Sequence, residues 1–503
     1  MKAVWMIFVV SVALAATAGC TNPDDLEYLD TSAPNDTAQT EVSGDVADEV
    51  DAEEEVFIVP DFCDLKEECG PGYVCDKENR KCQAAFDGVN GVFADHLVLG
   101  MSADFGGPAK DAGMAMRLGM EAYFTHVNNA GGVNGRTIEL RSINDNNNAN
   151  TALQNVKNLI HTGNDREVFA LIGNQGAPMV ALTAPYANAH HTVFFGPFAG
   201  GSETRKNDRY IFNFRASTET ETFTIVDYLT NNMEPMPVPP PNVILFAQAA
   251  SAGALDELGQ AGLVGVARGL QPHGIIRENV PVVSYGAGTT NVDAALQQFF
   301  TWFASTDRTH FPDGSSMSLV VLVAEGAPAA EFITKVADEM ERLRTGGAST
   351  YGLDAEAAGR VAMSMPIIAA ASSVGDSMKS ILKGRDPAKY CTQVLLSQVV
   401  PWFGSGMTGV TNYRNQLDEY QANTPPEYVS LEGYMTARMF VEALRDAGRD
   451  LSDEVLVEAL EAQKEVDLGV DVTYSFSPQN HNATDWVWGT FLDNTCTVQE
   501  YPR

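Results

Sequence analysis

Two short apolar runs, each followed by a glycine-bearing turn, stand out in the pattern of hydrophobic and polar positions. The first run is Val168–Ile172 with its turn at 173–178, and the second is Thr192–Phe195 with its turn at 196–201. Short apolar runs that alternate with helical segments predict buried parallel strands joined by helical crossovers. Because the loops at the carboxyl ends of such strands form the ligand crevice, we expect both turns to line a binding site.

The same alternation extends along most of the chain and predicts an α/β protein. Further strands are expected at 97–100, 137–142, 243–246, 280–283, 319–323 and 366–370, and helices at 109–129, 150–161, 179–190, 253–270, 291–304, 413–421 and 430–447. At 503 residues the chain is too long for a single core, so we expect two or three domains.

The first twenty residues have the pattern of an export signal. Met1 and Lys2 precede the apolar stretch Ala3–Ala16, and small residues then lead to Cys20. Such a stretch is too short to span a bilayer and is typical of a secretory signal. The end of the signal resembles the bacterial lipobox, in which Cys20 becomes the lipidated first residue. We therefore expect a lipid anchor on a bacterial membrane, at the periplasmic face or the outer membrane; the alternative is plain export with Cys20 discarded or free.

Residues 20–62 are expected to form a disordered acidic tether. Positions 21–62 contain fourteen Asp and Glu and no Lys or Arg, and such a composition buries too little apolar surface to fold. A flexible chain of this length spans about 35 to 40 Å. The formal net charge of the whole chain is −34, which argues against a nucleic-acid partner because phosphate binding needs basic surface.

Four cysteines lie within the next twenty residues, at Cys63, Cys69, Cys75 and Cys82. In an exported protein this spacing predicts two disulfides that staple a segment too small to fold alone. A zinc site is the less favoured alternative, because it would need paired CxxC spacing and a reducing compartment. We favour pairing of first with third and second with fourth. The segment resembles small cysteine-rich modules of the EGF kind and is interpreted as a spacer.

Several segments in register give the chain a family resemblance. They are Gly100-Met-Ser-Ala-Asp-Phe-Gly-Gly-Pro108, the helix end Asn128-Asn-Ala-Gly-Gly-Val-Asn-Gly-Arg136, and the strand end Ile143-Asn-Asp-Asn146. The paired glycines can stop a helix because they adopt positive φ. With these segments the chain resembles the type I periplasmic solute-binding proteins of the leucine/isoleucine/valine-binding family, which serve branched-chain amino acid ABC transporters.

The resemblance implies two Rossmann-like lobes with parallel sheets joined by a three-strand hinge. Lobe one is expected to comprise residues 96–217 and 402–472, and lobe two residues 218–401 and 473–503, with a final hairpin at 486–492. On this threading Cys391 and Cys496 both fall in lobe two, which favours a disulfide within one lobe.

The resemblance also implies where a ligand would bind. The family's serine falls on Ala177 and its threonine on Gly200, so both hydroxyls are absent here. Backbone N–H groups at these positions could still hold an anionic group. The ligand-binding positions expected on this basis are Gln175, Gly176, Ala177, Phe198, Ala199, Gly200, Thr218, Glu325 and Ser372.

Some of these positions have alternative interpretations. Phe198 could stack on a planar or apolar ligand or be a core aromatic, and Glu325 could meet an ammonium or be a solvated loop acid. Thr218 and Glu221 lie at the first crossing, where Glu221 could equally form a hinge salt bridge. Asp104 ends the first strand and is expected to cap a helix.

An enzymatic function is not expected. The sequence contains no GxSxG, HExxH or Walker A motif and no GxGxxG after a strand, and His190-His191 is interpreted as a surface or capping feature. Neither a metal nor a cofactor is expected. We predict an exported lipoprotein that closes on a small metabolite, such as an amino acid or amide, and presents it to a membrane ABC permease. The alternatives are a surface lipoprotein that senses a ligand or docks a partner without transport, and a fold that has lost its ligand.

Overall fold

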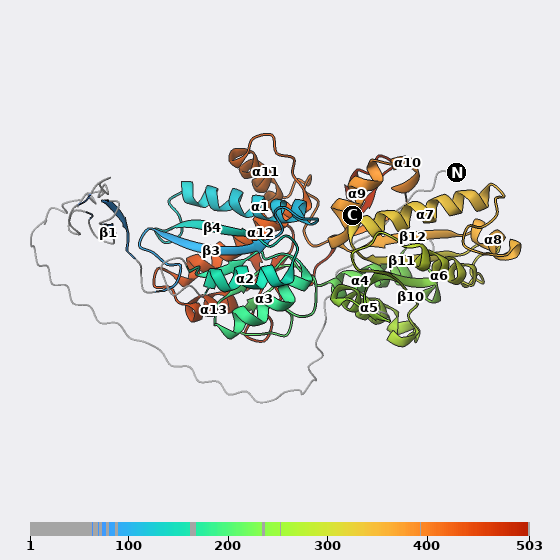
Figure 1. Ribbon diagram of the computed structural model, residues 1–503, viewed down its shortest axis with the longest axis horizontal. Coiled ribbons are helices and arrows are strands. Elements are labelled where there is room, and N and C mark those ends of the chain that lie inside the picture. Colours follow the sequence, from blue (N-terminus) through green and yellow to red (C-terminus); the bar gives the residue numbers. More distant parts are fainter. Residues whose placement is uncertain are drawn as a thin grey trace, which may run out of the picture. The chain divides into compact units, whose positions relative to one another are not determined.

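The computed structural model describes residues 63, 69, 73–76, 80–85, 89–160, 167–233, 237–251, 253–392 and 394–500 (Figure 1). The predicted signal segment, Cys20 and the acidic tether lie outside the described residues. The chain divides into two compact units, with the boundary between Gln83 and Ala84.

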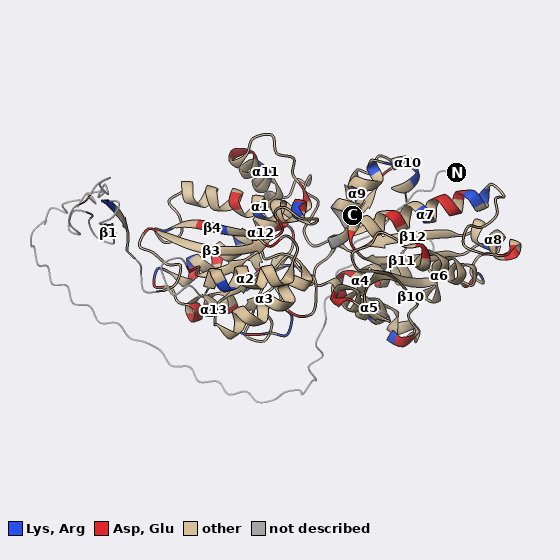
Figure 2. Ribbon diagram, in the orientation of Figure 1, with Lys and Arg blue, Asp and Glu red and all other residues tan. Residues whose placement is uncertain are grey.

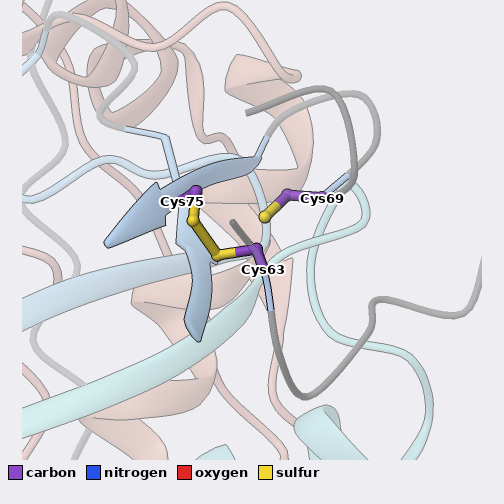
Figure 3. Close-up of side chains that lie close together, drawn as sticks. All are labelled: Cys63, Cys69 and Cys75. Atoms are coloured by element: carbon purple, nitrogen blue, oxygen red, sulfur yellow. A yellow bond between two sulfur atoms is a disulfide. The ribbon is translucent and has the colours of Figure 1, made fainter. Parts of the chain in front are cut away.

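The small unit holds the cysteine-rich segment. Strands β1 (Tyr73–Asp76) and β2 (Lys81–Ala84) form a two-stranded sheet. Disulfides join Cys63 to Cys75 and Cys69 to Cys82, which is the pairing favoured from the sequence. The sulfur atoms of Cys63, Cys69 and Cys75 lie within 4.8 Å of one another (Figure 3). The two disulfides account for this closeness, because each of these sulfurs is already bonded to another.

The first lobe of the larger unit is built on a five-stranded parallel sheet with the order β4-β3-β5-β6-β7. Its strands are β3 (His96–Ala103), β4 (Thr137–Asn144), β5 (Ala170–Ile172), β6 (Phe194–Phe195) and β7 (Ile211–Phe212). The sheet grows from β3 toward β4 on one side and toward β5 on the other. This reversal is the switch point at which the loops after the strands leave a crevice.

Six helices accompany this sheet (Figure 1). They are α1 (Lys110–Asn129), α2 (Ala149–Ile160), α3 (Ala177–Ala189), α11 (Thr408–Tyr420), α12 (Tyr428–Ala447) and α13 (Asp453–Ala462). Helices α1 and α12 pack so closely that the backbone of each contacts the other at a glycine. A β-carbon on Gly119 would fall 1.8 Å from the Ser430 carbonyl oxygen, and one on Gly433 would fall 2.2 Å from that of Met116. The return segment 408–447 is thereby fixed to the first lobe.

The second lobe is built on a mixed sheet with the order β10-β8-β11-β12-β13-β16-β17, in which β9 also pairs with β8. The strands β8, β10, β11, β12 and β13 run parallel, and β16 and β17 add an antiparallel hairpin. This hairpin extends to residue 500, whereas the hairpin expected at 486–492 covers only the strand β16. Their bounds are β8 (Val243–Ser251), β9 (Ala254–Leu255), β10 (Val282–Gly286), β11 (Met317–Val323), β12 (Met365–Ala370), β13 (Val394–Gln398), β16 (Trp488–Leu492) and β17 (Val498–Glu500). The core strand β11 is buried at every position, as expected for a central strand covered on both faces.

The helices of the second lobe are α4 (Thr218–Asp227), α5 (Glu257–Leu270), α6 (Asp293–Ala304), α7 (Gly326–Arg344), α8 (Ala355–Ala362), α9 (Gly375–Lys383) and α10 (Pro387–Tyr390). Among the described residues, every helix of the chain is too short or too polar to cross a lipid bilayer. Helix α7 carries charges of both signs (Figure 2), and Lys335 pairs with Glu331 one turn away and with Asp293 of α6. The disulfide Cys391–Cys496 joins the start of β13 to the β16–β17 turn, so it lies within this lobe.

Three chain crossings connect the lobes and pack against one another. Ala216, Val399 and Val487, one from each crossing, form a small buried cluster. Residues 473–483 remain with the first lobe: Tyr474 stacks on Phe214, and the Asn213 N–H donates to His481 O at 2.8 Å. The third crossing therefore follows residue 483, about ten residues later than the boundary expected from the sequence, because aromatic stacking holds this segment on the first lobe.

Candidate functional site

The two glycine-bearing turns of the first lobe lie side by side and are joined through their backbones. The Phe198 N–H donates to Asn174 O at 2.8 Å, and the Gly176 N–H donates to Phe198 O at 3.1 Å. Gln175 and Phe198 form a parallel bridge. The turns after β5 and β6 thus continue the sheet for one more pair of hydrogen bonds and present a common edge.

In the first turn, the side chain of Gln175 is engaged in the fold. Its Oε1 accepts from the Asp104 N–H at 3.1 Å, and its Nε2 donates to Ala109 O at 3.0 Å. Asp104 in turn accepts from the N–H groups of Gly107 and Ala109. These bonds brace the loop before α1, whose N-cap residue Ala109 has no side-chain cap hydrogen bond, so the expectation that Asp104 caps a helix is wrong. Gln175 therefore holds the loop after β3 and offers a ligand little beyond its backbone. The backbone of Gly176 has φ 89°, and helix α3 begins at the next residue, Ala177.

In the second turn, the hydroxyl of Thr218 occupies the space that a side chain at position 200 would fill. A β-carbon on Gly200 would fall 2.2 Å from Thr218 Oγ1. The Thr218 N–H donates to Gly200 O at 2.9 Å. Thr218 is buried, and its hydroxyl has no hydrogen-bond partner among the described residues. The Ala199 N–H donates within the turn, to Pro197 O at 2.8 Å, so it is not free for a ligand.

The end of the second turn contacts the second lobe. Glu257 of α5 accepts from the Glu203 N–H at 3.2 Å, and a β-carbon on Gly201 would fall 2.1 Å from its Oε1. Burial raises the pKa of the Glu257 carboxyl. The glycine at position 201 therefore leaves room for the Glu257 carboxyl to reach this turn.

The ring of Phe198 lies against a buried arginine on the first crossing. The guanidinium carbon of Arg215 is 5.0 Å from the ring centroid, and Arg215 is only 3% exposed. Its Nη2 donates to Ser372 Oγ at 2.5 Å and lies 3.5 Å from Glu221 Oε1. Its Nη1 lies 3.6 Å from Glu432 Oε1, which is beyond hydrogen-bond length. Arg215 thus meets an acid from each lobe.

Glu221 ties the start of the second lobe together. It is fully buried and accepts from the Ser372 N–H at 2.7 Å, from Ser372 Oγ at 3.0 Å and from Ser397 Oγ at 2.6 Å. Ser372 follows β12 and Ser397 belongs to β13, so one carboxylate on α4 fixes two neighbouring strands. These contacts give Glu221 a role at the hinge.

A cavity of about 20 Å³ lies where these groups meet, room for about one water molecule. Its polar lining comes from Arg215, Ser372, Gln398 and Glu432, and Phe198 borders it. The remaining lining residues are Val399, Val400, Tyr428 and Val429. Both lobes and two of the three crossings therefore contribute to one enclosed space.

Glu432, on helix α12 of the first lobe, is the acid of this cavity. Burial raises the pKa of its carboxyl to about 7, and the nearby charge of Arg215 only partly opposes this shift. A second arginine, the half-buried Arg205, donates to Asn482 Oδ1 at 2.8 Å and to Arg215 O at 3.1 Å. Burial beside Arg215 lowers the pKa of Arg205 to about 10.

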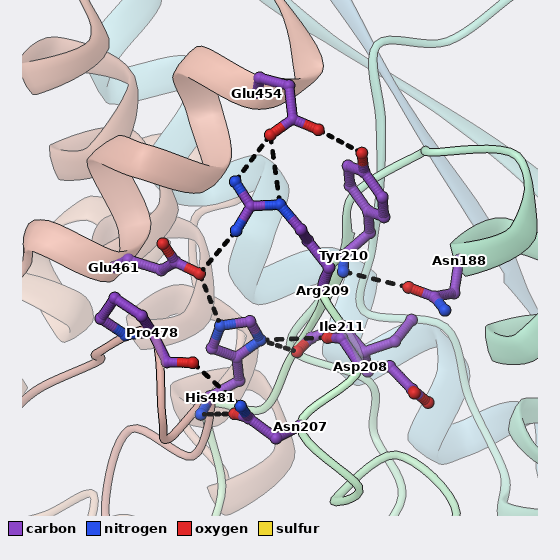
Figure 4. A network of polar contacts seen from close by, with 10 residues as sticks. All are labelled: Asn188, Asn207, Asp208, Arg209, Tyr210, Ile211, Glu454, Glu461, Pro478 and His481. Atoms are coloured by element: carbon purple, nitrogen blue, oxygen red, sulfur yellow. Dashed lines mark hydrogen bonds and ion pairs between the residues drawn. The ribbon is translucent and has the colours of Figure 1, made fainter.

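The segment leading into the crossing is anchored by a polar network (Figure 4). Arg209 donates to Glu454 Oε2 at 2.7 Å and to Glu461 Oε1 at 3.1 Å, both on α13. Tyr210 also donates to Glu454. The ring nitrogens of buried His481 face Ile211 O at 3.0 Å and Glu461 Oε1 at 3.1 Å. These contacts hold residues 207–211, and with them the start of the crossing, on the first lobe.

The expected site residues fall into two groups. One connected set of contacts includes Gln175, Gly176, Phe198, Gly200, Thr218 and Ser372, with Ala177 and Ala199 as chain neighbours. Glu325 is exposed at the start of α7, where its N–H donates to Tyr285 Oη at 2.9 Å, and it takes no part in the cavity. His190 and His191 are exposed, and His191 stacks on Tyr210.

Arg215 and Glu432 were not among the expected residues. A signal was present for each: Arg215 stands in the run Asn213-Phe-Arg-Ala216 between apolar neighbours, and Glu432 stands among Leu431, Tyr434 and Met435 on a helix that is otherwise apolar there. A charged residue on a buried face implies a partner, since an unpaired buried charge is costly.

Comparisons with known proteins agree on the fold. Residues 97–337 match the protein family described as periplasmic binding protein. A possible leucine/isoleucine/valine-binding protein from Rhodopirellula baltica SH 1 is 25% identical, with a TM-score of 0.65 over 81% of this chain and 96% of that one. No curated protein sequence matches the chain.

Two more distant structures carry the same architecture. A fatty acid ABC transporter substrate-binding protein from Thermomonospora curvata is 16% identical, with a TM-score of 0.63 over 82% of this chain and 92% of that one. The branched-chain amino acid transporter substrate-binding protein of Streptococcus pneumoniae, solved with isoleucine, is 14% identical, with a TM-score of 0.55 over 80% of this chain and 98% of that one.

Proposed function

The chain has the type I periplasmic binding protein fold, and its residues 97–337 match that family; from this premise we propose that it captures a small polar metabolite between its lobes for an ABC permease. The observation that carries the proposal is the backbone pairing of the two turns, Gly176 N–H to Phe198 O and Phe198 N–H to Asn174 O. This pairing supports a binding edge next to the switch point between β3 and β5, near which ligands bind in such folds.

Binding would proceed by hinge closure. A ligand would first contact the turns of the first lobe, and contacts from the second lobe would then favour the closed state. Ser372 and Glu257 are among the second-lobe residues that already contact first-lobe or crossing residues. Packing of Ala216, Val399 and Val487 keeps the three crossings together, so that bending there moves the lobes as units.

The proposed ligand class is an amino acid, an amide or a related short polar metabolite. The names of the solved relatives mention isoleucine in two cases and fatty acids in a third. Ala177 and Gly200 lack the family hydroxyls, so backbone donors and the Thr218 hydroxyl are the polar groups proposed to meet the ligand in this part of the site.

A thermal-shift screen of the full chain tests this proposal. A ligand that binds only the folded state adds about 2.7 kcal/mol to the free energy of unfolding when present at a hundred times its Kd. We expect at least one amino acid, amide or polyamine to raise the melting temperature in a saturable way, with the Ala177→Asp variant shifted less. Absence of any shift across these classes would count against a solute-binding function.

The proposed cellular location is extracytoplasmic, with Cys20 as the lipid anchor. The sequence pattern at residues 1–20 supports the anchor. Metabolic labelling with palmitate in a bacterial host is expected to mark the wild type and not the Cys20→Ser variant. Equal labelling of both would contradict the anchor without bearing on ligand binding.

A second candidate function is ligand sensing or partner docking at the cell surface without transport. The observation that favours it is the separate cysteine-rich unit with its own two disulfides, which solute capture does not require. Uptake of the screened ligand by cells that carry or lack the gene distinguishes the two. Unchanged uptake, combined with tight binding in vitro, would favour sensing.

A further inference from the structure

The cavity between the lobes is bordered by Arg215, one of whose donors lacks a partner in the described part of the chain, and two further unpartnered polar groups belong to adjoining residues outside the cavity lining. Arg215 Nε has no hydrogen-bond partner among the described residues, and neither do the Thr218 hydroxyl and the Asn174 side-chain amide. All three residues are at most 3% exposed. Buried polar groups are almost always hydrogen-bonded in folded proteins, so the unpartnered Nε of Arg215, beside the Phe198 ring and the cavity, calls for a further occupant.

Contacts around Phe198 connect the three groups. Its N–H donates to the backbone oxygen of Asn174, its ring lies 5.0 Å from the guanidinium of Arg215, and Thr218 binds the carbonyl of Gly200 two residues on. The polar groups therefore belong to one small region, at the carboxyl ends of β5, β6 and β7.

The two opposite charges that face each other in this region, Arg215 and Glu432, also do not form a hydrogen bond. Arg215 Nη1 and Glu432 Oε1 are 3.6 Å apart, too far for a hydrogen bond. The guanidinium thus keeps unused donors beside a cavity that must widen beyond its present volume of about 20 Å³ to admit an acid group, and a planar fork of N–H groups suits a carboxylate in bidentate geometry. An acid group bound there would gain the donors that Glu432 does not use.

We infer that Arg215 is the residue that holds the acid group of the ligand, and that Glu432 is the counter-charge which this acid group displaces. The inference rests on the proposed solute-binding function and deepens it by naming the ligand chemistry, a small carboxylic acid. It also assigns the acid group to a side chain on the first crossing, in addition to the backbone donors of the two turns.

The groups around Glu432 determine the protonation state of its carboxyl once a ligand has displaced it from Arg215. The charged or titratable groups that face it are Arg215 on the first crossing, Arg205 on the loop after β6, Glu221 on α4 and Tyr474 on β15 (Thr473–Tyr474). With a ligand carboxylate on Arg215, Glu432 would lose its main compensating charge and gain a like charge nearby. It would then take up a proton from solvent, so binding above neutral pH is accompanied by proton uptake.

Isothermal titration calorimetry of the full chain tests both parts. The probes are two matched pairs, isoleucine with isoleucinamide and octanoate with octanamide, because the members of each pair have nearly the same shape and differ in the acid group. We expect the wild type to prefer the acid of at least one pair by about tenfold or more, as a charge-assisted bidentate contact implies. Titrations at pH 8 in buffers of different ionisation enthalpy report the proton uptake.

Three variants separate the possible outcomes. Arg215→Gln is expected to lose about 10- to 100-fold in acid affinity while keeping its amide affinity. Glu432→Gln is expected to bind the acid at least as tightly as the wild type and to take up no proton. Arg268→Gln, which removes an exposed arginine paired with Glu219, is the control and should behave as the wild type.

The inference is overturned if Arg215→Gln keeps the wild-type preference, or if Glu432→Gln still takes up a proton. Should Arg215→Gln fail to fold, the Glu432→Gln result decides. A wild type that binds amide and acid equally would overturn the inference and leave the proposed function intact, with a single water as the occupant of the cavity. A wild type that binds none of the probes or of the screened metabolites would remove both.

Discussion

The hydroxyl of Thr218 occupies the space in which a side chain at residue 200 would begin, since a β-carbon on Gly200 would fall 2.2 Å from Thr218 Oγ1. The two residues are also joined by the hydrogen bond from the Thr218 N–H to Gly200 O. A turn of the first lobe and the first residue of α4 are therefore packed against each other at the first crossing.

This contact predicts that Gly200→Ala is destabilising. The added methyl must displace the Thr218 hydroxyl, and overpacking of this kind costs about 1 to 3 kcal/mol. Adding Thr218→Ala should recover part of the loss, because the other near atoms of Thr218 lie 3.2 Å and 3.3 Å from the new carbon. Urea unfolding of the three proteins measures the effect, and Gly406→Ala, which meets no atom within 4 Å, is the control. Equal stability of Gly200→Ala and wild type would contradict this packing.

Glu221 and Glu219 offer a matched pair of acids on one helix. Glu221 is fully buried and accepts from Ser372 and Ser397, whereas Glu219 forms an exposed pair with Arg268. We expect Glu221→Gln to lower the free energy of unfolding by about 2 kcal/mol or more, because it leaves Arg215 and two serines without a charged acceptor. Glu219→Gln should change it by less than about 0.5 kcal/mol. Similar losses in guanidinium unfolding would mean that the buried network contributes little.

The arrangement of the strands follows from local pattern, and so much of the fold could be predicted. Short apolar runs predicted the central strands β3, β5, β6, β8, β11 and β12, because a parallel strand buried on both faces needs apolar residues throughout. Strands β7, β9, β13 and β17 were not predicted. Helix α7 was not predicted, although Phe332, Val336, Met340 and Leu343 recur at helical spacing and are buried. Its helical spacing is present in the sequence but is a weaker signal than the wholly apolar strand that precedes it.

Only the part of the site that depends on strand order and backbone pairing could be predicted from the sequence. Adjacent turns after β5 and β6 follow from strand order, and their pairing through Gln175 and Phe198 agrees with that expectation. The partners of Arg215 could not be predicted, since Ser372 and Glu432 come from distant segments that meet only in the folded chain. The same holds for Tyr474, whose stacking on Phe214 keeps residues 473–483 on the first lobe.

Removal of the lobe-two disulfide should weaken the fold without freeing the hinge. Cys391 and Cys496 close a loop of sequence separation 105 within one lobe. The double change Cys391→Ala and Cys496→Ala is expected to lower the free energy of unfolding by about 2 to 5 kcal/mol, with ligand affinity changed less than about threefold. The double change Cys63→Ala and Cys75→Ala lies in the other unit and should leave the main calorimetric transition in place. A large loss of affinity in the first variant would imply that the bond also positions the lobes.

Glu432 should make the protein less stable as the pH rises through neutrality. Its folded pKa is about 7 against an ordinary value of 4.5, because burial disfavours the charged form. Between these values the folded state holds more protons than the unfolded state at this group, so its contribution to the free energy of unfolding falls as pH rises. At about 1.4 kcal/mol for each unit of pKa, the loss amounts to roughly 3 kcal/mol in this range.

We expect Glu432→Gln, which keeps the shape and removes the titration, to gain stability relative to the wild type at pH 8 and not at pH 4.5. Chemical unfolding of both proteins at the two pH values isolates this group, because the other titrations cancel in the difference. A stability difference that does not change with pH would show that Glu432 is already ionised at low pH and is held by stronger partners than Arg215.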